Sequence, residues 1–233
     1  MNERSNETNP NTSSDKNPLN IIRILFSLLL IGDLVWGVYL STYLFFIYFT
    51  NWGLTCIAIF YIISVLSIRI KKLEPSVRIL FETSWALEWC VSIVYWSAVA
   101  PADRLDVMSA ILAHTVPLCT LLIDFCLNEI IFVRKHIIVP ISISTIYLFC
   151  VNLPYTLALK HIYPLINYTD VWTYLLIPAM LLIEIISFEL ALQIKRKIVK
   201  NKQERKKNSQ AGRDQALMDQ IATEVVPNFI VVS

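Results

Sequence analysis

The chain has 233 residues, of which 56% are hydrophobic and 16% charged, and its formal net charge at pH 7 is +2. A composition this apolar indicates an integral membrane protein and leaves no room for a separate soluble domain of ordinary size. The sequence has only four glycines and no ten-residue segments that alternate between apolar and polar residues. These features favour membrane-spanning helices over a β-barrel.

The chain begins with a polar segment, residues 1–19, that is rich in Asn, Ser, Thr, Asp and Glu and has no apolar period. Such a segment is typical of a disordered tail, and it is too long and too polar for the start of a signal peptide. It contains two glycosylation sequons, which begin at Asn6 and Asn11. Their use depends on the side of the membrane that the tail occupies.

Six apolar stretches follow, and each is long enough, or nearly so, for the roughly 20 residues that a bilayer requires. We predict an all-α bundle of six transmembrane helices over residues 20–195, with spans at about 21–49, 54–68, 79–100, 107–132, 137–159 and 171–194. A short break is expected between the first two spans, at Thr50–Gly53. Residues 196–233 are expected to form a basic, largely disordered tail.

The basic residues gather at alternate ends of the predicted helices. One set of flanks carries Arg23, the cluster from Arg69 to Arg78, Arg134 with Lys135, and the run from Lys195 to Lys207, whereas the other set carries only Arg104 and Lys160. Because basic residues are retained on the cytosolic side, both termini are expected to be cytosolic. The sequon at Asn167 then lies on the opposite side and is a candidate glycosylation site. The basic run after Lys195 serves as a topology anchor or binds anionic lipid.

The most unusual stretch is residues 108–129, which is long enough to cross a bilayer yet contains His114, Pro117, Asp124 and Asn128. Polar groups inside a membrane are costly, so they mark either a functional site or a buried polar contact between helices. Pro117 has no N–H to donate to the carbonyl of Ala113, so the helix is expected to be weak beside the histidine. His114 is therefore either a functional residue or a hydrogen-bonding partner of a neighbouring helix.

The depth of a residue can be estimated by counting from the basic end of its helix at about 1.5 Å per residue. Thr50 lies nineteen residues from Arg69 and His114 lies twenty residues from Arg134, which is roughly 28–30 Å of helix in each case. Both side chains are then expected near the same face of the membrane. A hydroxyl and an imidazole at one depth on different helices suit a nucleophile and its base.

The same count predicts a layer of carboxyl groups near the middle of the membrane. Asp33, Glu88 and Asp124 each lie ten residues from a basic anchor and Glu184 lies eleven from Lys195, with no Lys or Arg at that level. This layer is either a proton or cation site or a set of neutral, hydrogen-bonded groups that fix helix packing. No metal site or disulfide framework is predicted, because the five cysteines lie inside apolar stretches without paired spacing. No cofactor is predicted.

Two short motifs resemble a known group of membrane proteins. The segment YFTNWGLT at residues 48–55 and the segment HTVPLCTLLIDFCLN at residues 114–128 resemble motifs of the rolling-stone-like proteins. More distantly, they resemble the androgen-induced-gene family of six-helix proteins of the endoplasmic reticulum. Members of that family hydrolyse fatty acid esters of hydroxy fatty acids with an intramembrane threonine and histidine. The resemblance implies that Thr50 and His114 are the catalytic residues here.

Three functions are therefore considered. The first is an intramembrane lipid-ester hydrolase in the endoplasmic reticulum or plasma membrane, with a membrane lipid as its partner and no nucleic acid. The second is a non-enzymatic rolling-stone-like protein that acts in adhesion, fusion or lipid organisation. The third is a proton- or cation-coupled transporter that uses the four carboxyl groups, although the sequence has no matched pair of broken helices.

Overall fold

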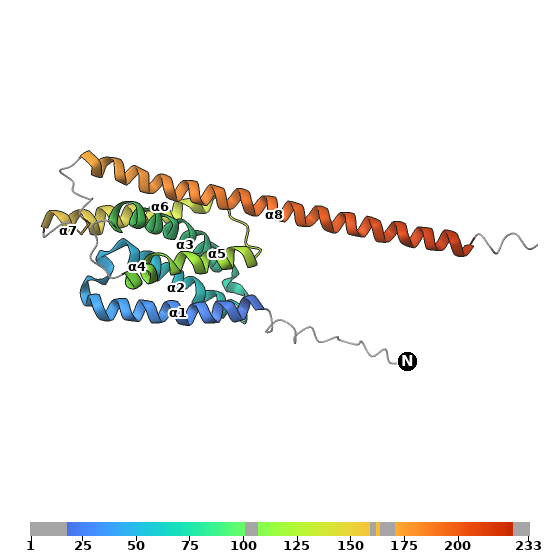
Figure 1. Cartoon of the computed structure of the whole chain (residues 1–233), viewed down its shortest axis with the longest axis horizontal. Helices are drawn as coiled ribbons and strands as arrows, with labels where there is room; N and C mark the ends of the chain where they lie inside the picture. The colour runs from blue at the N-terminus through green and yellow to red at the C-terminus, as the bar shows by residue number, and fades with distance from the viewer. Residues whose placement is uncertain (1–17, 101–106, 159–161, 164–170, 226–233) are drawn as a thin grey trace, which may run out of the picture. The chain divides into compact units, whose positions relative to one another are not determined.

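The structure is a computed structural model that describes residues 18–100, 107–158, 162–163 and 171–225. Its contacts divide the chain into two units, one ending at Leu192 and one beginning at Gln193. Every secondary-structure element in the described ranges is helical. In the first unit the helices run side by side along their length (Figure 1). The prediction of an all-α protein is confirmed for the described residues, and several of its helices are long and apolar enough to cross a membrane.

Five stretches of the described chain are long and apolar enough to cross a membrane: Pro18–Tyr39, Phe49–Ser67, Val107–Leu127, Arg134–Ala158 and Thr173–Asp219. They correspond to five of the six predicted spans. The remaining one is helix α3, Glu74–Val94, whose apolar character is reduced by Arg78, Glu82 and Glu88.

The break between the first two helices lies earlier in the chain than the sequence predicted. Helix α1 covers Pro18–Ser41, a 3-10 segment follows at Thr42–Ile47, and α2 begins at Phe49 and ends at Ser67. The segment expected to be a break, Thr50–Gly53, is therefore the first turn of α2. Side chains of that turn stabilise it: the amide of Asn51 and the indole of Trp52 donate to the carbonyls of Phe45 and Phe46 at 2.7 and 2.8 Å.

Helix α3 is the most deeply buried helix of the first unit. Every residue from 81 to 88 is buried, and α3 packs against α2, α5 and α6. A π-helical turn, Tyr95–Val99, continues it. Because other helices cover α3, its acidic side chains meet protein groups instead of lipid, which makes a less apolar sequence tolerable at this position.

The predicted weak point near His114 is confirmed. Helix α4, Val107–His114, ends at the histidine, Thr115 forms a turn, and α5 runs over Val116–Leu127 with Pro117 in its first turn. The N–H of Thr115 still bonds to Ile111 and that of Cys119 to Thr115, so the chain continues in nearly the same direction after the interruption (Figure 1). The missing donor of proline explains why the helix is interrupted here.

The chain after α5 returns through a 3-10 turn at Arg134–Ile137, α6 at Ile138–Ile146, a π-helical segment at Tyr147–Asn152 and α7 at Leu153–Ala158. Helix α8 covers Val171–Val225. The segment from residue 196 to Val225, expected to be largely disordered, is thus helical. It is rich in Lys, Arg, Gln, Glu and Ala, which are strong helix formers, and proline is absent until Pro227.

An aromatic core joins α2, α3, α5 and α8. Trp85 stacks on Phe125 with ring centroids 4.5 Å apart, and its indole N–H donates to the carbonyl of Ser187 at 3.1 Å. Phe132 contacts both Phe81 and Phe188 edge-on. Large apolar side chains also remain exposed on the outside of the helices, as expected for a surface that faces lipid.

Candidate functional site

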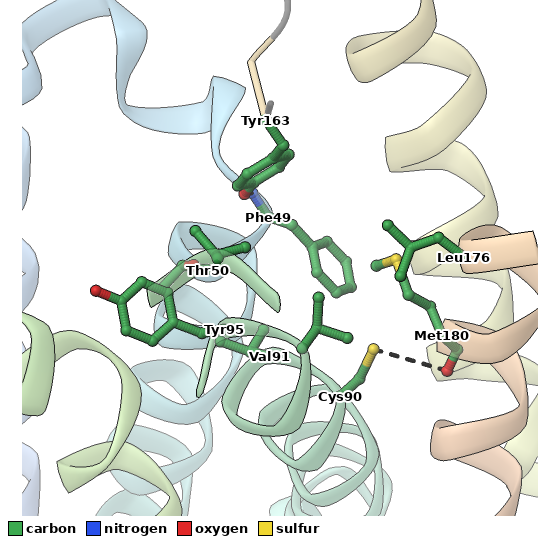
Figure 2. A pocket seen from close by; sticks show the side chains of 10 residues that line it. Phe49, Thr50, Cys90, Val91, Tyr95, Tyr163, Leu176 and Met180 are labelled. Atoms are coloured by element: carbon green, nitrogen blue, oxygen red, sulfur yellow. Dashed lines mark hydrogen bonds between the residues drawn. The ribbon is translucent and has the colours of Figure 1, made fainter. Parts of the chain in front are cut away.

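An apolar pocket lies where the first turn of α2 meets the end of α3 and the first part of α8. Figure 2 shows Thr50 beside the ring of Tyr95, with Tyr163 next to the start of α2 and Met180 across the pocket. Nearly all the remaining lining is apolar, including Phe49, Val91 and Leu176. A pocket with this lining suits an apolar group, with few polar groups available to orient a ligand.

Thr50 is positioned by contacts at the start of α2. The backbone N–H of Phe49, which an isolated helix would leave without a partner, donates to the hydroxyl of Tyr163 at 2.9 Å. The hydroxyl of Tyr147 donates to the carbonyl of Ile47 at 2.7 Å. The side chain of Thr50 reaches the hydroxyl of Tyr163 and is only half-buried. Two tyrosines from the later part of the chain therefore determine where the Thr50 hydroxyl lies.

Tyr163 lies outside the membrane-spanning segments, and its ring is half-buried. The enclosure of its hydroxyl raises the pKa of this phenol to about 12, although the N–H of Phe49, which stabilises the phenolate, acts in the opposite direction. The phenol consequently remains protonated at neutral pH. Its oxygen accepts from the Phe49 N–H and lies within reach of the Thr50 hydroxyl, which acts on the pKa in the same direction as the Phe49 N–H.

His114 is 6% exposed and lies at the interrupted end of α4. Its ring stacks on that of Tyr95 with centroids 3.5 Å apart and an interplanar angle of 9°. The hydroxyl of Ser92 donates to the His114 carbonyl at 2.5 Å, and the indole of Trp96 donates to the Thr115 hydroxyl at 3.0 Å. The end of α3 thus stabilises the break that Pro117 creates.

The two residues that the sequence proposed as catalytic are linked through Tyr95. Thr50 and Tyr95 line the same pocket. The ring of Tyr95 also stacks on the ring of His114. The imidazole itself is not part of the pocket lining. Tyr95 was not identified from the sequence, because its place one turn before the end of an apolar helix gives no signal of a polar role.

The four predicted mid-membrane carboxyl groups have different surroundings. Asp124 is fully buried and accepts from Arg23 at 2.7 and 2.9 Å, and from the amide of Asn128 at 2.6 Å. The expectation that no Lys or Arg lies near these carboxyl groups is therefore wrong for Asp124. Its charge is balanced by Arg23, which makes it part of a buried ion pair that joins α1 to α5.

The helix-based count failed for Asp124, and equally for His114, because both were counted from Arg134 and the chain before Arg134 is not helical. Helix α5 ends at Leu127, and residues 128–133 have no helical structure. The carboxyl of Glu82 holds this segment: it accepts from the N–H of Val133 at 2.9 Å and contacts the ring of His136 at 2.6 Å. Residues separated by extended chain lie at a depth that a rise of ~1.5 Å per residue cannot predict.

The other three carboxyl groups lie in two places. Glu88 is 1% exposed and faces α2, so that a Cβ on Gly53 would lie 2.6 Å from its Oε1. It lies close enough to the half-buried Asp33 of α1 for their charges to interact. Glu184 instead accepts from the hydroxyl of Ser144 at 2.5 Å, on the side of α6. Among the described residues, neither carboxylate oxygen of Glu88 has a hydrogen-bond partner.

The described ranges contain no group of three His, Cys, Asp or Glu side chains placed to hold a metal ion. Asn167, the candidate glycosylation site, lies outside the described residues. Comparisons with protein-family models, with curated proteins and with solved structures give no match to this chain. The function is therefore argued from the site itself.

Proposed function

We propose that the protein is an intramembrane hydrolase of lipid esters, with Thr50 as the nucleophile and His114 as the general base. One observation carries the proposal: Thr50 lies in the first turn of α2, in an apolar pocket that it shares with Tyr95, and Tyr95 stacks on His114. The resemblance of residues 48–55 and 114–128 to the androgen-induced-gene family supports the same pair. Fatty acid esters of hydroxy fatty acids, or similar lipids, are the proposed substrates.

The chemistry follows from the types of group present. In the proposed reaction the Thr50 oxygen attacks the ester carbonyl while His114 accepts the hydroxyl proton through one bridging water, because the imidazole does not line the pocket. His114 then returns a proton to the departing alcohol, which leaves an acyl-threonine. Water then attacks this ester with His114 again acting as base, and Thr50 is regenerated. The negative charge that develops on the carbonyl oxygen is favoured near the N-terminal end of α2, because this end of the helix dipole is positive.

The apolar lining suits the acyl chain of such a substrate. Phe49, Val91 and Leu176 supply hydrocarbon contacts, while the hydroxyl groups of Thr50 and Tyr163 lie at one end of the pocket. A lipid ester would place its chain among the apolar groups and its ester beside the hydroxyls. Large apolar side chains remain exposed on the bundle's lipid-facing surface, so the substrate enters laterally from the membrane.

We further propose that α3 is the sixth span and that both termini are cytosolic, in a membrane of the endoplasmic reticulum or the cell surface. The support is the distribution of basic residues, together with the packing of α3 against α2, α5 and α6. With six spans, all the strongly basic flanks lie on one side. Thr50 and His114 then lie near the opposite, non-cytosolic side.

The test is covalent labelling of the purified full-length protein with a lipid-like fluorophosphonate, which reacts with activated hydroxyl groups. Labelling is expected for wild type and for Thr50→Ser, and it is expected to be lost in Thr50→Ala and His114→Ala. The matched control is Thr55→Ala, because Thr55 lies in the same helix but donates its hydroxyl hydrogen to the carbonyl of Asn51 at 2.6 Å. Thr55→Ala should label like wild type.

Persistent labelling of Thr50→Ala would show that another residue is the nucleophile. Absence of labelling in a folded wild-type protein would favour the alternative, a non-enzymatic rolling-stone-like role in adhesion, fusion or lipid organisation. The third alternative, a proton- or cation-coupled transporter, has weaker support, because Asp124 is held in an ion pair with Arg23 and Glu184 lies with Ser144.

A further inference from the structure

A second cavity lies at the opposite end of α2 from Thr50, where α1 begins and α2 ends. It has about 1150 Å³ of open space and is lined largely by polar side chains from α1, α2, the start of α3 and the segment after α5. Its charged groups are Arg23, Lys71, Arg78, Glu74 and Glu129. The cavity thus differs in chemistry from the apolar pocket around Thr50 and has no part in the hydrolysis proposed above.

Arg23 is a rigid donor in the wall of this cavity. Its Nε and one Nη donate to the two carboxylate oxygens of Asp124 at 2.7 and 2.9 Å, and its guanidinium lies 5.7 Å from the ring centroid of Phe60. Arg23 is only 9% exposed, yet it lines the cavity. Because a guanidinium has five N–H groups in a fixed plane, the groups not used by Asp124 are held in place for an anionic ligand.

Ser64 provides a second, independent indication of a ligand. It is 1% exposed and lines the same cavity. Its hydroxyl has no hydrogen-bond partner among the described residues. A buried hydroxyl without a partner is unfavourable by about 1–3 kcal/mol, and a ligand that accepts a hydrogen bond would remove this penalty. The oxygen atoms of a phosphate group are such acceptors, and they also suit Arg23 and Arg78.

The balance of charge and the surroundings distinguish between sources of phosphate. Arg23 is neutralised by Asp124, and Lys71 lies 3.6 Å from Glu74. The cavity is therefore close to neutral, which disfavours a free phosphate dianion and suits a zwitterion. Ile21 and Ile24, which flank Arg23 along α1, are 54% and 43% exposed, so apolar surface for acyl chains lies beside Arg23.

We propose that this cavity binds the headgroup of an amine-bearing phospholipid. The phosphodiester contacts Arg23, Ser64 and Arg78, the ammonium group contacts the carboxylates of Glu74 and Glu129, and the acyl chains lie along α1. An ammonium group donates hydrogen bonds to carboxylates, which a quaternary choline cannot do. The site is therefore expected to prefer phosphatidylethanolamine to phosphatidylcholine.

The experiment is native mass spectrometry of the full-length protein in detergent, with phosphatidylethanolamine, phosphatidylcholine or inorganic phosphate added in turn. Wild type is expected to retain phosphatidylethanolamine at the lowest lipid concentration. Arg78→Gln should weaken its binding about tenfold, the effect of losing one charge-assisted hydrogen bond. Ser64→Ala should weaken the binding of phosphatidylethanolamine and of phosphatidylcholine to a similar extent. Glu129→Gln should reduce the preference for phosphatidylethanolamine over phosphatidylcholine. Arg78 is exposed and outside the buried ion pair, so its substitution should leave the fold intact.

The matched control is Arg134→Gln, which removes an exposed arginine that pairs with Glu189 and does not line the cavity. It should bind lipid like wild type. The proposal would be overturned if Arg78→Gln and Arg134→Gln changed the binding of phosphatidylethanolamine equally. It would also be overturned if Ser64→Ala bound this lipid as tightly as wild type does. Displacement of the lipid by inorganic phosphate would also overturn it, because the cavity would then be a site for a soluble anion.

Discussion

At the scale of single residues, the ion pair between Arg23 and Asp124 is a buried, bidentate link between distant parts of the chain. The two residues are 101 positions apart, and both are buried. A bidentate contact satisfies the carboxylate, and Asn128 adds a third donor at 2.6 Å. Breaking such a pair leaves one charge buried without a partner, which is more costly than losing an exposed pair.

We therefore expect Asp124→Ala to lower the free energy of unfolding by about 3–5 kcal/mol, since Arg23 would remain buried and uncompensated. The matched control is Glu189→Ala, because Glu189 pairs with an Arg134 side chain that is 72% exposed. Glu189→Ala should lower the free energy of unfolding by less than about 1 kcal/mol. Thermal unfolding in detergent measures both. Equal effects would show that the buried pair contributes no more than the exposed one.

Tyr163, which precedes α8 in the chain, contacts the start of α2. Replacing it with Phe removes the oxygen that accepts from the Phe49 N–H, and is expected to lower stability by about 1–3 kcal/mol at neutral pH. The phenol has a pKa of about 12 in the folded protein and about 10 when unfolded. Because the folded state favours the protonated phenol, its contribution is complete below pH 10 and is lost as the pH rises toward 12.

Wild type and Tyr163→Phe should accordingly differ by a constant amount below pH 10 and converge above it. The measurement is thermal unfolding of both proteins across the alkaline range, with the phenolate absorbance followed in parallel. A difference that stays constant up to pH 12, or that grows with pH, would contradict the assigned environment of Tyr163.

At the scale of helices, α2 and α3 approach closely at Gly53. A Cβ at this position would lie 2.6 Å from Oε1 of Glu88 and 3.6 Å from a methyl group of Val91. Glycine therefore permits the buried carboxyl to lie against the backbone of α2. The contact matters for the proposed site because Gly53 follows Thr50 within the same turn of α2.

Gly53→Ala is thus expected to destabilise the protein by about 1–3 kcal/mol through overpacking. Gly32→Ala is the control, because nothing lies within 4 Å of the new Cβ there, and it should be neutral or stabilising by up to about 1 kcal/mol. Adding Glu88→Ala to Gly53→Ala should recover much of the loss. Additive effects of the two changes in thermal unfolding would show that Gly53 and Glu88 are not in contact.

Helix α3 illustrates how packing alters the expected burial of polar residues. Its acidic side chains reduce its hydropathy, yet Glu82 and Glu88 are both enclosed. Glu82 contacts the backbone of Val133 and the ring of His136, so it stabilises the return of the chain after α5. The position of Glu82 in an apolar span was visible in the sequence, whereas its partners fifty residues away were not.

At the scale of the whole molecule, the side of the membrane on which each loop lies depends on α3. If α3 crosses the membrane, residues 160–170 lie on the side opposite to the N-terminus. If α3 does not cross, the number of crossings before this loop changes by one and the loop moves to the same side as the N-terminus. The sequons at Asn6, Asn11 and Asn167 distinguish between these topologies.

We expect Asn167 alone to be glycosylated when the protein is synthesised in the presence of endoplasmic reticulum membranes. A shift in gel mobility should be abolished by Asn167→Gln and unaffected by the double change Asn6→Gln and Asn11→Gln. Glycosylation of the N-terminal sequons alone would show the reverse of the proposed orientation. Glycosylation at all three sites would show an even number of spans between the N-terminal segment and Asn167.

The apolar stretches that can cross a membrane could be located from the sequence alone, because the requirement for about 20 apolar residues per crossing depends only on local composition. The same holds for the interruption at His114, since proline lacks a donor wherever it stands. These local properties were enough to predict helices long and apolar enough to cross a membrane, and a break in the helix beside His114.

Contacts between distant segments were determined by packing instead. The depth of Asp124 could not be counted from Arg134, because Glu82 holds the intervening chain in a non-helical path. The stack of Tyr95 on His114 and the pairing of Arg23 with Asp124 likewise depend on which helix faces meet. A residue's depth and the direction of its side chain follow from the position of neighbouring helices, and that position depends on side chains throughout the bundle.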